Sequence, residues 1–380
     1  MKLEKIVVIG PVYPYKGGIS HYTGLMVRTL KTKYDTTVIS YKMQYPKIMF
    51  RKPQKDYTNK AFEIPGTRYL INTANPFNIL GCVKKIKALN PDLIIIQWWH
   101  PYFAPCYNIL LGGLKKYKTI MICHNVLPHE RFPLDRFLTK CTLGKVGGCI
   151  VHSEEDKNNL LNLFPNKPYR KNVHPTYNAF KMKDMSRAKA RELLNISKDE
   201  KILLFFGFVR KYKGLKHLLN AMPDILNDNR DVRLFIVGDF GKDKDEYLQQ
   251  INELSLGDHI VIKDGYTPDE EVEKYFACAD ICMCPYESAT QSGIVQIAFG
   301  FGLPVLVTDV GGLPEVVDDK KTGYVVEPEK PDAIASAVKD YFGNNREESF
   351  RENVDKEKMR FSWERMMETI EELSNEIDGR

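Results

Sequence analysis

Short apolar runs of strand length alternate with helical stretches along most of the 380-residue chain. The first half contains five such runs, at residues 6–9, 37–39, 93–97, 119–123 and 149–151. The second half contains five more, at residues 202–206, 232–237, 260–262, 281–283 and 305–307. Uninterrupted apolar strands separated by helices are typical of parallel sheets that are covered on both faces. The two series therefore predict two Rossmann-like α/β domains.

The boundary between the predicted domains lies where this periodicity fails. Residues 172–180, NVHPTYNAF, show no periodic pattern, and Pro175 restricts the backbone there. We therefore expect a first domain over residues 1–175 and a second over residues 176–360, each of ordinary domain size. Near the end of the chain, apolar residues recur at helical spacing and predict an amphipathic helix within residues 361–380. These residues are Trp363, Met366, Met367, Ile370, Leu373 and Ile377.

Charge divides along the same boundary. Residues 1–175 hold 27 Lys and Arg against 10 Asp and Glu, a net charge of +17. The remaining residues hold 28 against 39, a net charge of −11, and such asymmetry favours separate tasks for the two halves. The lysine clusters of the first half predict either a solvated surface or attraction to an anionic membrane face or a polyanionic acceptor. No nucleic-acid-binding motif accompanies them, so nucleic acid is not an expected partner.

Two features bear on the compartment. The longest apolar runs fall far short of the roughly 20 residues that span a bilayer, and residues 1–5 lead directly into the first strand, which predicts no secretory signal. The eight cysteines form no Cys-x-x-Cys pair, and Cys282 and Cys284 lie in a predicted buried strand, as expected of reduced core thiols. We therefore expect a cytoplasmic protein, with peripheral contact at the inner membrane face if the basic half binds membrane.

The segment from residue 285 to residue 323, PYESATQSGIVQIAFGFGLPVLVTDVGGLPEVVDDKKTG, carries most of the candidate chemistry. Ser292 and Gly293 precede one helical run, and Gly311 and Gly312 follow a buried strand. Leu313, Pro314 and Glu315 then predict a second helix start, with proline in its first turn. Glycine-flanked helix starts offer free N–H donors and a positive dipole end to anions. Two of them close together predict a diphosphate ligand, whereas glycines alone would only make tight turns.

Two other loops have related features. The loop GPVYPYKGGIS, residues 10–20, follows the first strand, and its Gly17 and Gly18 allow the backbone to approach a ligand. This loop lacks the GxGxxG pattern, so no nicotinamide cofactor is expected. The run FGFVRKYKG, residues 206–214, leaves the first strand of the second domain and contains Arg210 and Lys213. Cations at a strand end can neutralise the charge that develops on a departing diphosphate without a metal.

Further candidates follow strands of the first domain. His124 comes directly after the strand at residues 119–123, where ligands collect in open α/β sheets, and His129 and Glu130 lie on the adjoining loop. Trp99 and His100 follow the strand at residues 93–97 and could form a platform for an acceptor, although a purely structural role for His100 is an equal alternative. No Asp-x-Asp occurs at a strand end, so no metal site is predicted.

These motifs closely resemble those of family-4 glycosyltransferases, and the resemblance extends across nearly the whole chain. It implies the GT-B architecture, in which two Rossmann-like domains face each other across a cleft and the terminal helix, here within residues 361–380, packs back on the first domain. It also implies retaining transfer of a sugar from a nucleotide diphosphate. The nucleotide sugar is then a co-substrate, and neither a cofactor nor a metal is required.

The resemblance also implies roles for individual residues. Lys213 matches a lysine that binds the diphosphate, whereas Arg210 only lies near the family arginine, whose position holds Phe208. His124 matches a strand-end histidine that contacts the transferred sugar. The implied donor-binding residues are Gly17, Gly18, Gly207, Ser292, Gly293, Gly311, Gly312 and Glu315.

One departure from the family pattern concerns carboxylates. Two family glutamates that touch the sugar and the ribose fall on Ala289 and Ile297 here, and Glu287 and Gln296 lie near them but out of phase. The chain therefore resembles a divergent branch that grips its donor differently.

The expected function is transfer of a sugar from a UDP- or GDP-linked donor on the second domain to an acceptor on the basic first domain. A glycan or lipid-linked glycan of surface polysaccharide synthesis is the favoured acceptor. One alternative is a nucleotide-sugar epimerase, which the missing glutamates disfavour. The other is a catalytically silent nucleotide-sugar-binding subunit, which the missing glutamates favour but Lys213, His124 and the glycine loops oppose.

Overall fold

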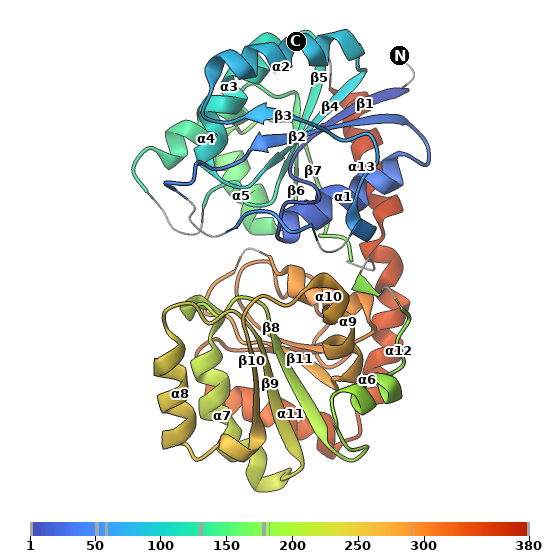
Figure 1. Ribbon diagram of the computed structural model, residues 1–380. Coiled ribbons are helices and arrows are strands. Elements are labelled where there is room, and N and C mark those ends of the chain that lie inside the picture. Colours follow the sequence, from blue (N-terminus) through green and yellow to red (C-terminus); the bar gives the residue numbers. More distant parts are fainter. Residues whose placement is uncertain are drawn as a thin grey trace. The chain divides into compact units, whose positions relative to one another are not determined.

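The computed structural model describes residues 3–49, 53–57, 60–128, 132–176, 180–181, 183–289 and 291–377. The candidates His129 and Glu130, and Thr290 of the glycine-rich segment, lie outside the described residues. The chain divides into two compact units (Figure 1). Unit 1 comprises Met1–Pro175 together with Ser362–Arg380, and unit 2 comprises Thr176–Phe361.

Unit 1 is built on a seven-stranded parallel sheet with the strand order β3-β2-β1-β4-β5-β6-β7. Its strands are β1 (Lys5–Ile9), β2 (Asp35–Met43), β3 (Arg68–Asn72), β4 (Leu93–Trp98), β5 (Lys118–Cys123), β6 (Gly148–Val151) and β7 (Tyr169–Lys171). Its helices are α1 (Gly18–Leu30), α2 (Pro76–Leu89), α3 (Ala104–Gly113), α4 (Asp135–Leu143), α5 (Glu154–Leu163) and α13 (Trp363–Glu376), with short 3-10 turns η1 (Lys60–Phe62) and η2 (Pro101–Phe103).

Unit 2 is built on a six-stranded parallel sheet with the strand order β10-β9-β8-β11-β12-β13. Its strands are β8 (Lys201–Phe206), β9 (Val232–Gly238), β10 (Ile260–Asp264), β11 (Ile281–Cys284), β12 (Val305–Thr308) and β13 (Gly323–Val326). Its helices are α6 (Arg187–Leu193), α7 (Leu215–Asp228), α8 (Lys244–Glu253), α9 (Asp269–Cys278), α10 (Gly293–Gly300), α11 (Pro331–Gly343) and α12 (Glu347–Glu357), with 3-10 turns η4 (Lys211–Lys213), η5 (Gly257–His259) and η6 (Lys358–Phe361). No helix in the described parts of either unit is long and apolar enough to cross a bilayer.

All ten predicted strands are confirmed, and the prediction of two parallel α/β units is correct. The three strands that the pattern missed, β3, β7 and β13, each lie at the edge of a sheet. Edge strands are covered less completely, so polar residues are tolerated in them, as in the sequences RYLIN of β3 and YRK of β7. Every central strand was thus found from its apolar run, whereas of the four edge strands only β10 was.

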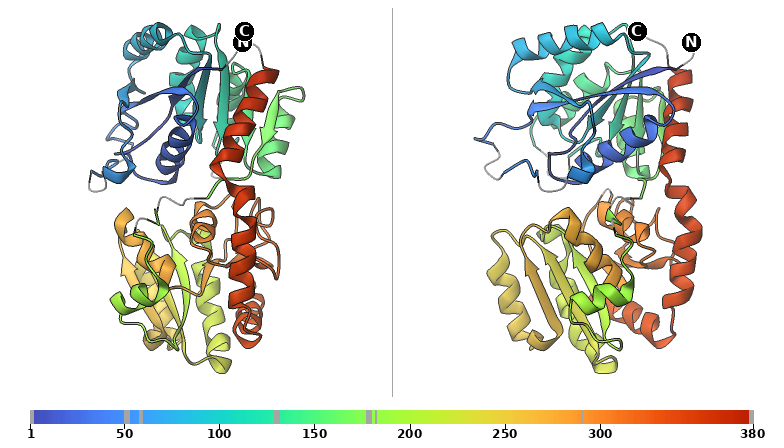
Figure 2. Two further views of the ribbon diagram at one scale, coloured as in Figure 1. Left: turned by 90° about the vertical axis from the view of Figure 1, so that its right-hand side faces the viewer. Right: turned by 45° about the vertical axis from the view of Figure 1, so that its right-hand side comes forward.

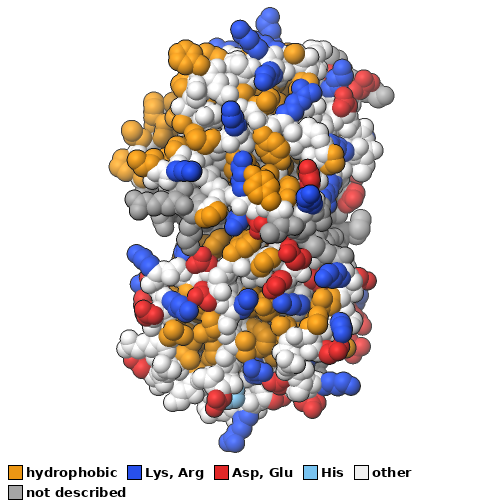
Figure 3. All heavy atoms as spheres, viewed as in Figure 1, with side chains coloured by type: hydrophobic (Ala, Val, Ile, Leu, Met, Phe, Trp, Pro, Cys, Tyr) orange, Lys and Arg blue, Asp and Glu red, His pale blue; other side chains and the backbone are white. Residues whose placement is uncertain are grey.

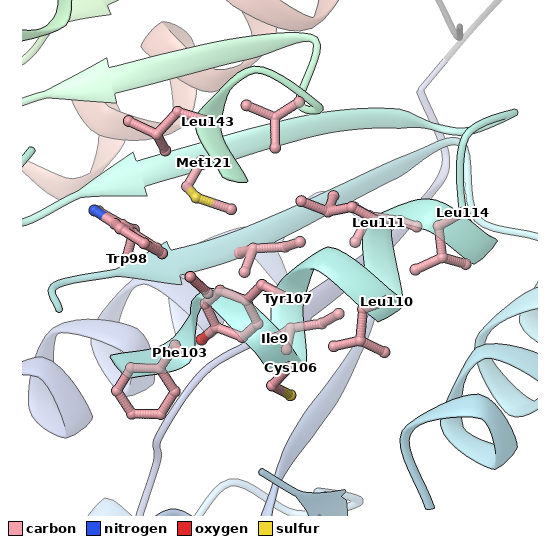
Figure 4. Close-up of a cluster of buried hydrophobic side chains, with 14 of the residues drawn as sticks. Ile9, Trp98, Phe103, Cys106, Tyr107, Leu110, Leu111, Leu114, Met121 and Leu143 are labelled. Carbon is pink, nitrogen blue, oxygen red and sulfur yellow. The ribbon is translucent and has the colours of Figure 1, made fainter. Parts of the chain in front are cut away.

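A large part of the core of unit 1 lies between the sheet and the helices α2 and α3. Trp98 from β4, Tyr107 from α3 and Met121 from β5 pack together, and none of them is exposed to solvent (Figure 4). All six residues of β4 are buried, which explains why the run at residues 93–97 is wholly apolar or amide-bearing. Full burial of each large apolar side chain stabilises the fold by about 1.5–3 kcal/mol.

Helix α13 packs on unit 1, although it follows unit 2 in the sequence. It contacts α1 and the strands β5, β6 and β7 (Figure 2). Glycines make room for it, because a Cβ on Gly148 would stand 3.0 Å from Leu373 Cδ1. Its acidic residues pair with basic residues of unit 1, as in Lys33–Glu371 at 2.8 Å and Arg170–Glu376 at 2.6 Å. The helix therefore offsets part of the positive charge of residues 1–175.

The predicted helix start at Leu313–Pro314–Glu315 is wrong. The segment makes isolated turns, in which Leu313 N–H donates to Val310 and Val316 N–H donates to Leu313, both at 3.2 Å. The chain then reverses at Asp318, whose carbonyl accepts from the N–H groups of Lys321 and Thr322, both at 3.0 Å. The chain continues from this reversal into β13, so too few residues remain before the strand to form a helix.

Candidate active site

In unit 2, residues 207–214 form the loop that follows β8. A glycine with positive φ stands at each end of this loop. Gly207 has φ +97° and Gly214 has φ +67°, values that residues with a side chain rarely adopt. A Cβ on Gly214 would stand 1.9 Å from the carbonyl oxygen of Pro285, so glycine also allows the loop to approach the segment after β11. These two positions fix the path that brings Lys213 into the unit.

The Lys213 side chain is buried, with 8% of its surface exposed. Burial lowers the pKa of its ammonium to about 8, and the charge of Arg210 acts in the same direction, while Cys284 and Cys282 oppose it. Within the described residues no carboxylate lies within ion-pair distance of Lys213. Its Nζ instead lies over the Tyr286 ring, 5.6 Å from the centroid. A buried cation without an acidic partner is costly, which marks this group as a candidate ligand-binding residue.

Arg210 stands beside Lys213 in the loop and is exposed. Its guanidinium lies 5.5 Å from the centroid of the Phe208 ring, and its Nη1 donates to the carbonyl of Val209 at 3.2 Å. It too makes no ion pair with any described carboxylate. In contrast, Lys211 pairs with Glu246 at 3.3 Å, and both side chains are 65% exposed. The loop thus presents two positive charges that the unit does not neutralise.

Tyr286 connects Lys213 to the start of α10. Its hydroxyl and Ser292 Oγ are 3.4 Å apart, and its carbonyl accepts a hydrogen bond from Thr308 at the end of β12. Ser292 is the N-cap of α10 and accepts from the N–H of Val295 at 3.5 Å. The structure therefore brings the predicted residues Lys213, Gly207, Ser292 and Gly293 to one end of the sheet. Tyr286 was not predicted, although its place directly after β11 was visible in the sequence.

The remaining predicted donor residues form the turn after β12. Gly311 has φ +51°, Gly312 is buried, and Glu315 is half-buried. The carbonyl of Glu315 accepts from Arg360 Nη2 at 2.7 Å, which ties this turn to η6. Without the predicted helix, Gly311 and Gly312 contribute a turn rather than a second helix dipole.

The two polar residues near the missing glutamates lie in different surroundings. Glu287 accepts from Lys216 and His217, both at 3.0 Å, and these bonds hold its pKa below the usual value even though burial opposes them. This contact ties the segment after β11 to α7. Gln296 on α10 is fully buried, and both polar atoms of its side chain lack a hydrogen-bond partner among the described residues. Neither amide nor carboxylate thus replaces the family glutamates directly.

In unit 1, His124 follows β5 and is buried at the carboxyl end of the sheet. Its Nε2 lies 2.8 Å from Gln97 Oε1, and its ring stands edge-on to Tyr22 with the centroids 4.6 Å apart. Burial holds the pKa of His124 well below its ordinary value, and His152 and His174 add to this effect. The imidazole is therefore neutral at pH 7 and suited to hydrogen bonding.

His152 and His174 pack beside His124 but were not predicted. Their ring centroids lie 5.7 Å and 6.2 Å from that of His124, and both rings also contact Tyr22. Burial lowers the pKa of His152 to about 4 and that of His174 to about 3. The sequence held a usable signal, because His152 comes directly after β6 and His174 shortly after β7, as His124 does after β5.

The other predicted residues of unit 1 lie at the start of α1 and directly after β4. Gly17, with φ +104°, is the N-cap of α1, and Gly18 is its first residue. Trp99 Nε1 donates to Tyr45 Oη at 3.0 Å, so the indole helps to position the tyrosine hydroxyl. His100 Nδ1 accepts from the N–H of Tyr102 at 3.0 Å and caps η2, which is the structural role.

None of these groups forms a metal centre: among the described residues, no three His, Cys, Asp or Glu side chains are arranged to hold a metal ion. The structure also contains eight free cysteines, of which only Cys141 is not fully buried.

Comparison with known proteins finds similarity mainly over unit 2. Residues 186–358 match the family Glycosyl transferases group 1. An uncharacterized glycosyltransferase of Methanocaldococcus jannaschii is 30% identical over 205 residues, which cover 50% of this chain and 49% of that protein. The GDP-mannose-dependent alpha-(1-6)-phosphatidylinositol monomannoside mannosyltransferase of Mycolicibacterium smegmatis is 32% identical over 169 residues, covering 42% and 43%. The chain spans about half the length of the relatives it matches.

Solved structures resemble the whole chain in fold. Sucrose-phosphate synthase from Thermosynechococcus elongatus has a TM-score of 0.75 at 19% identity and covers 98% of both chains. Anabaena HepE in complex with UDP has a TM-score of 0.73 at 15% identity, covering 99% of this chain and 100% of that chain. The chain thus has the two-unit α/β fold of these proteins, the GT-B fold expected from the sequence, and its residues 186–358 match the glycosyl transferases group 1 family.

Proposed function

We propose that the protein is a retaining, metal-independent glycosyltransferase, with the nucleotide-sugar donor on unit 2 and the acceptor on unit 1. Lys213 carries the proposal, because it is a buried ammonium that no described carboxylate neutralises. Protein interiors rarely hold such a charge without a partner, so its partner is expected to be a ligand anion. The diphosphate of a nucleotide sugar supplies that anion.

Each part of the loop then has a task in the reaction. The bond between the anomeric carbon and the diphosphate oxygen breaks, and negative charge accumulates on the departing diphosphate. Lys213 and Arg210 stabilise that charge from fixed positions, and the N–H groups at the start of α10 add the positive end of the helix dipole. The sugar forms its new bond to an acceptor oxygen, whose proton passes to an oxygen of the departing diphosphate. No step requires a resident cofactor.

The activities in the names of two relatives support the choice of donor and acceptor. The Mycolicibacterium relative is GDP-mannose-dependent and acts on a phosphatidylinositol monomannoside, and a Salmonella typhimurium relative is a lipopolysaccharide 1,2-N-acetylglucosaminetransferase. A UDP- or GDP-linked donor and a glycan or lipid-linked glycan acceptor in surface polysaccharide synthesis fit these activities. Reaction at the cytoplasmic face, with peripheral contact through the basic surface of unit 1, completes the proposal. Acidic side chains are concentrated on unit 2 in the view of Figure 3.

The test is a panel of UDP-, GDP- and ADP-sugars incubated with the protein, with and without a membrane extract. Nucleotide release that requires the extract is the expected result. Lys213→Ala should lower turnover at least about 100-fold, the scale of losing one preorganised charge-stabilising group, while its melting temperature stays at or above that of the wild type. Unchanged turnover in this variant would remove Lys213 from the mechanism.

A silent nucleotide-sugar-binding subunit is the second candidate, favoured by Ala289 and Ile297 at the positions of the two glutamates. The same panel separates it from the transferase. A subunit of this kind binds a nucleotide sugar tightly and releases no nucleotide with any extract. Conversion of one donor sugar into another without extract would instead identify an epimerase.

A further inference from the structure

Unit 1 contains a pocket beside the loop that carries Gly17 and Gly18. The pocket has a volume of about 770 Å³, within the range of small-molecule sites, and lies between the end of β2 and residues 53–57. Its charged lining residues are Lys42, Lys47 and Lys55. No Asp or Glu is among its described lining residues, and none of the three lysines pairs with a described carboxylate. The pocket is therefore positively charged at neutral pH.

Aromatic side chains form the other part of the lining. Tyr15, Tyr45 and Tyr57 line the pocket, and the Lys55 ammonium lies over the Tyr15 ring, 4.9 Å from its centroid. Tyr57 is 65% exposed, so part of its ring is open to a ligand. Tyrosines of this kind offer a flat apolar face for the C–H side of a sugar and a hydroxyl for hydrogen bonding.

The pocket is held by specific contacts rather than by loose loops. The side chain of Gln54 bridges both backbone groups of Tyr45, donating to the carbonyl at 2.9 Å and accepting from the N–H at 3.2 Å. The backbone of Gln54 accepts from Lys16 at 3.0 Å, and Asp56 N–H donates to Pro14 at 2.7 Å. Residues 53–57 are thereby fastened to the loop that continues into Gly17.

One lining residue of the pocket, Tyr45, is held by Trp99, which the sequence predicted as an acceptor residue. Tyr45 accepts a hydrogen bond from Trp99 at 3.0 Å, and burial raises the pKa of Tyr45 to about 12, so its hydroxyl stays protonated and uncharged. The acceptor platform expected from Trp99 is thus extended to a tyrosine that lines a cavity with lysines.

We propose that this pocket binds the acceptor and that the acceptor is anionic, a saccharide bearing a phosphate or carboxylate that Lys47 and Lys55 contact while Tyr57 covers the sugar face. The inference rests on the proposed transfer function, which places the acceptor on unit 1. The shared chemistry is an anion next to a sugar ring. It arises either from a phosphate that joins a glycan to a carrier or from a uronic acid within the glycan.

The probes that separate these two sources are glucose 1-phosphate and glucuronic acid, with glucose as the neutral counterpart. Binding to the full chain is measured by ligand-observed NMR in the presence of saturating nucleoside diphosphate, which keeps the probes from the donor site. At least one anionic probe should bind about tenfold or more tightly than glucose, and its affinity should fall as NaCl rises from about 0.05 to about 0.5 M. Whichever anion binds better identifies the source.

The pocket variant is Lys47→Gln/Lys55→Gln, and its matched control is Lys84→Gln/Lys87→Gln, the same charge change on exposed residues of α2. The pocket variant should lose about tenfold or more in affinity for the anionic probe, whereas the control should keep wild-type affinity. Equal binding of glucose and the anions, or equal losses in both variants, would overturn the proposal. Because nucleotide binding is measured in the same samples, its absence would instead count against the proposed function.

Discussion

The Nζ of Lys213 lies over the ring of Tyr286, 5.6 Å from the ring centroid. A ring face attracts a cation by about 0.5–2 kcal/mol but does not neutralise it, so this contact does not replace a carboxylate partner. Tyr286 also reaches Ser292 at the start of α10. The ammonium, the ring and the helix start therefore lie together, where the proposed function places the diphosphate.

Gly207→Ala should weaken nucleotide binding by displacing Lys213. A Cβ at this position would stand 3.0 Å from Nζ, and the backbone φ of +97° disfavours any side chain. We expect a loss of about 1–2 kcal/mol in the free energy of unfolding from backbone strain, and at least about a tenfold loss in affinity for a nucleoside diphosphate. Calorimetric titration of the purified variant measures the affinity.

The control for this variant is Gly66→Ala in unit 1. Gly66 has φ +81°, and a Cβ there would meet nothing within 4 Å. It should lose similar stability and keep nucleotide affinity. If both variants lose affinity equally, backbone strain and not the position of Lys213 is responsible.

Nucleotide binding should decline as pH rises through about 8. The pKa of Lys213 is about 8 because of burial, so the ammonium is largely lost above this value. The terminal phosphate has a second pKa near 6 and is already ionised from about pH 7.5, so the ligand does not titrate in this window. We expect affinity to fall up to about tenfold per pH unit between about pH 8 and 9.5. Lys213→Arg stays charged and should give a flat profile, whereas a flat wild-type profile would contradict this assignment.

Unit 1 should be destabilised by mild acid. The pKa values of His152 and His174 are held to about 4 and about 3 by burial, and that of His124 is also lowered, whereas an unfolded histidine titrates near 6.5. Below about pH 6.5 the unfolded state binds more protons than the folded state. The contribution of these histidines to the free energy of unfolding is therefore complete above this pH and is lost as pH falls. Each histidine contributes a slope of about 1.4 kcal/mol per pH unit. Urea unfolding between about pH 7 and 5 measures how the free energy of unfolding changes with pH. Uptake of fewer than two protons on unfolding would refute a neutral histidine cluster.

Gln296→Leu should stabilise unit 2. Both polar atoms of the Gln296 side chain are buried without a described partner, and such groups cost about 1–3 kcal/mol. Leucine has a similar volume and removes the cost, so the melting temperature should rise in the absence of nucleotide. A drop in stability would mean that the amide is paired in solution. Gln291→Leu, just before the N-cap of α10, is the comparison variant and should show no such gain.

The central strands and the cationic loop could be predicted because each depends on a local signal. The apolar runs of β1, β4 and β8 require burial on both faces, and Lys213 follows a strand end. The helix expected at Leu313 failed for the opposite reason. Pro314 and the glycines suggested a helix start, but the turn at Asp318, closed by hydrogen bonds to its carbonyl, decides the path.

Features that depend on contacts between distant segments were not accessible from the sequence. The isolation of Lys213 from carboxylates becomes visible only when Glu287 is found bound to Lys216 and His217 and Glu246 to Lys211. The lysine pocket of unit 1 likewise depends on Gln54 fastening residues 53–57 to the end of β2. No spacing along the chain encodes either arrangement.

The most direct test of the role of Lys213 compares Lys213→Met with Lys211→Met in nucleoside diphosphate affinity and in melting temperature. Lys213→Met should lose about tenfold or more in affinity for UDP or GDP, the worth of one charge-assisted contact, without a lower melting temperature, because a buried unpaired charge is removed. Lys211→Met should change neither quantity. Retained affinity in Lys213→Met, or a melting temperature that falls together with affinity, would contradict the claim that Lys213 is held in unit 2 to bind the diphosphate.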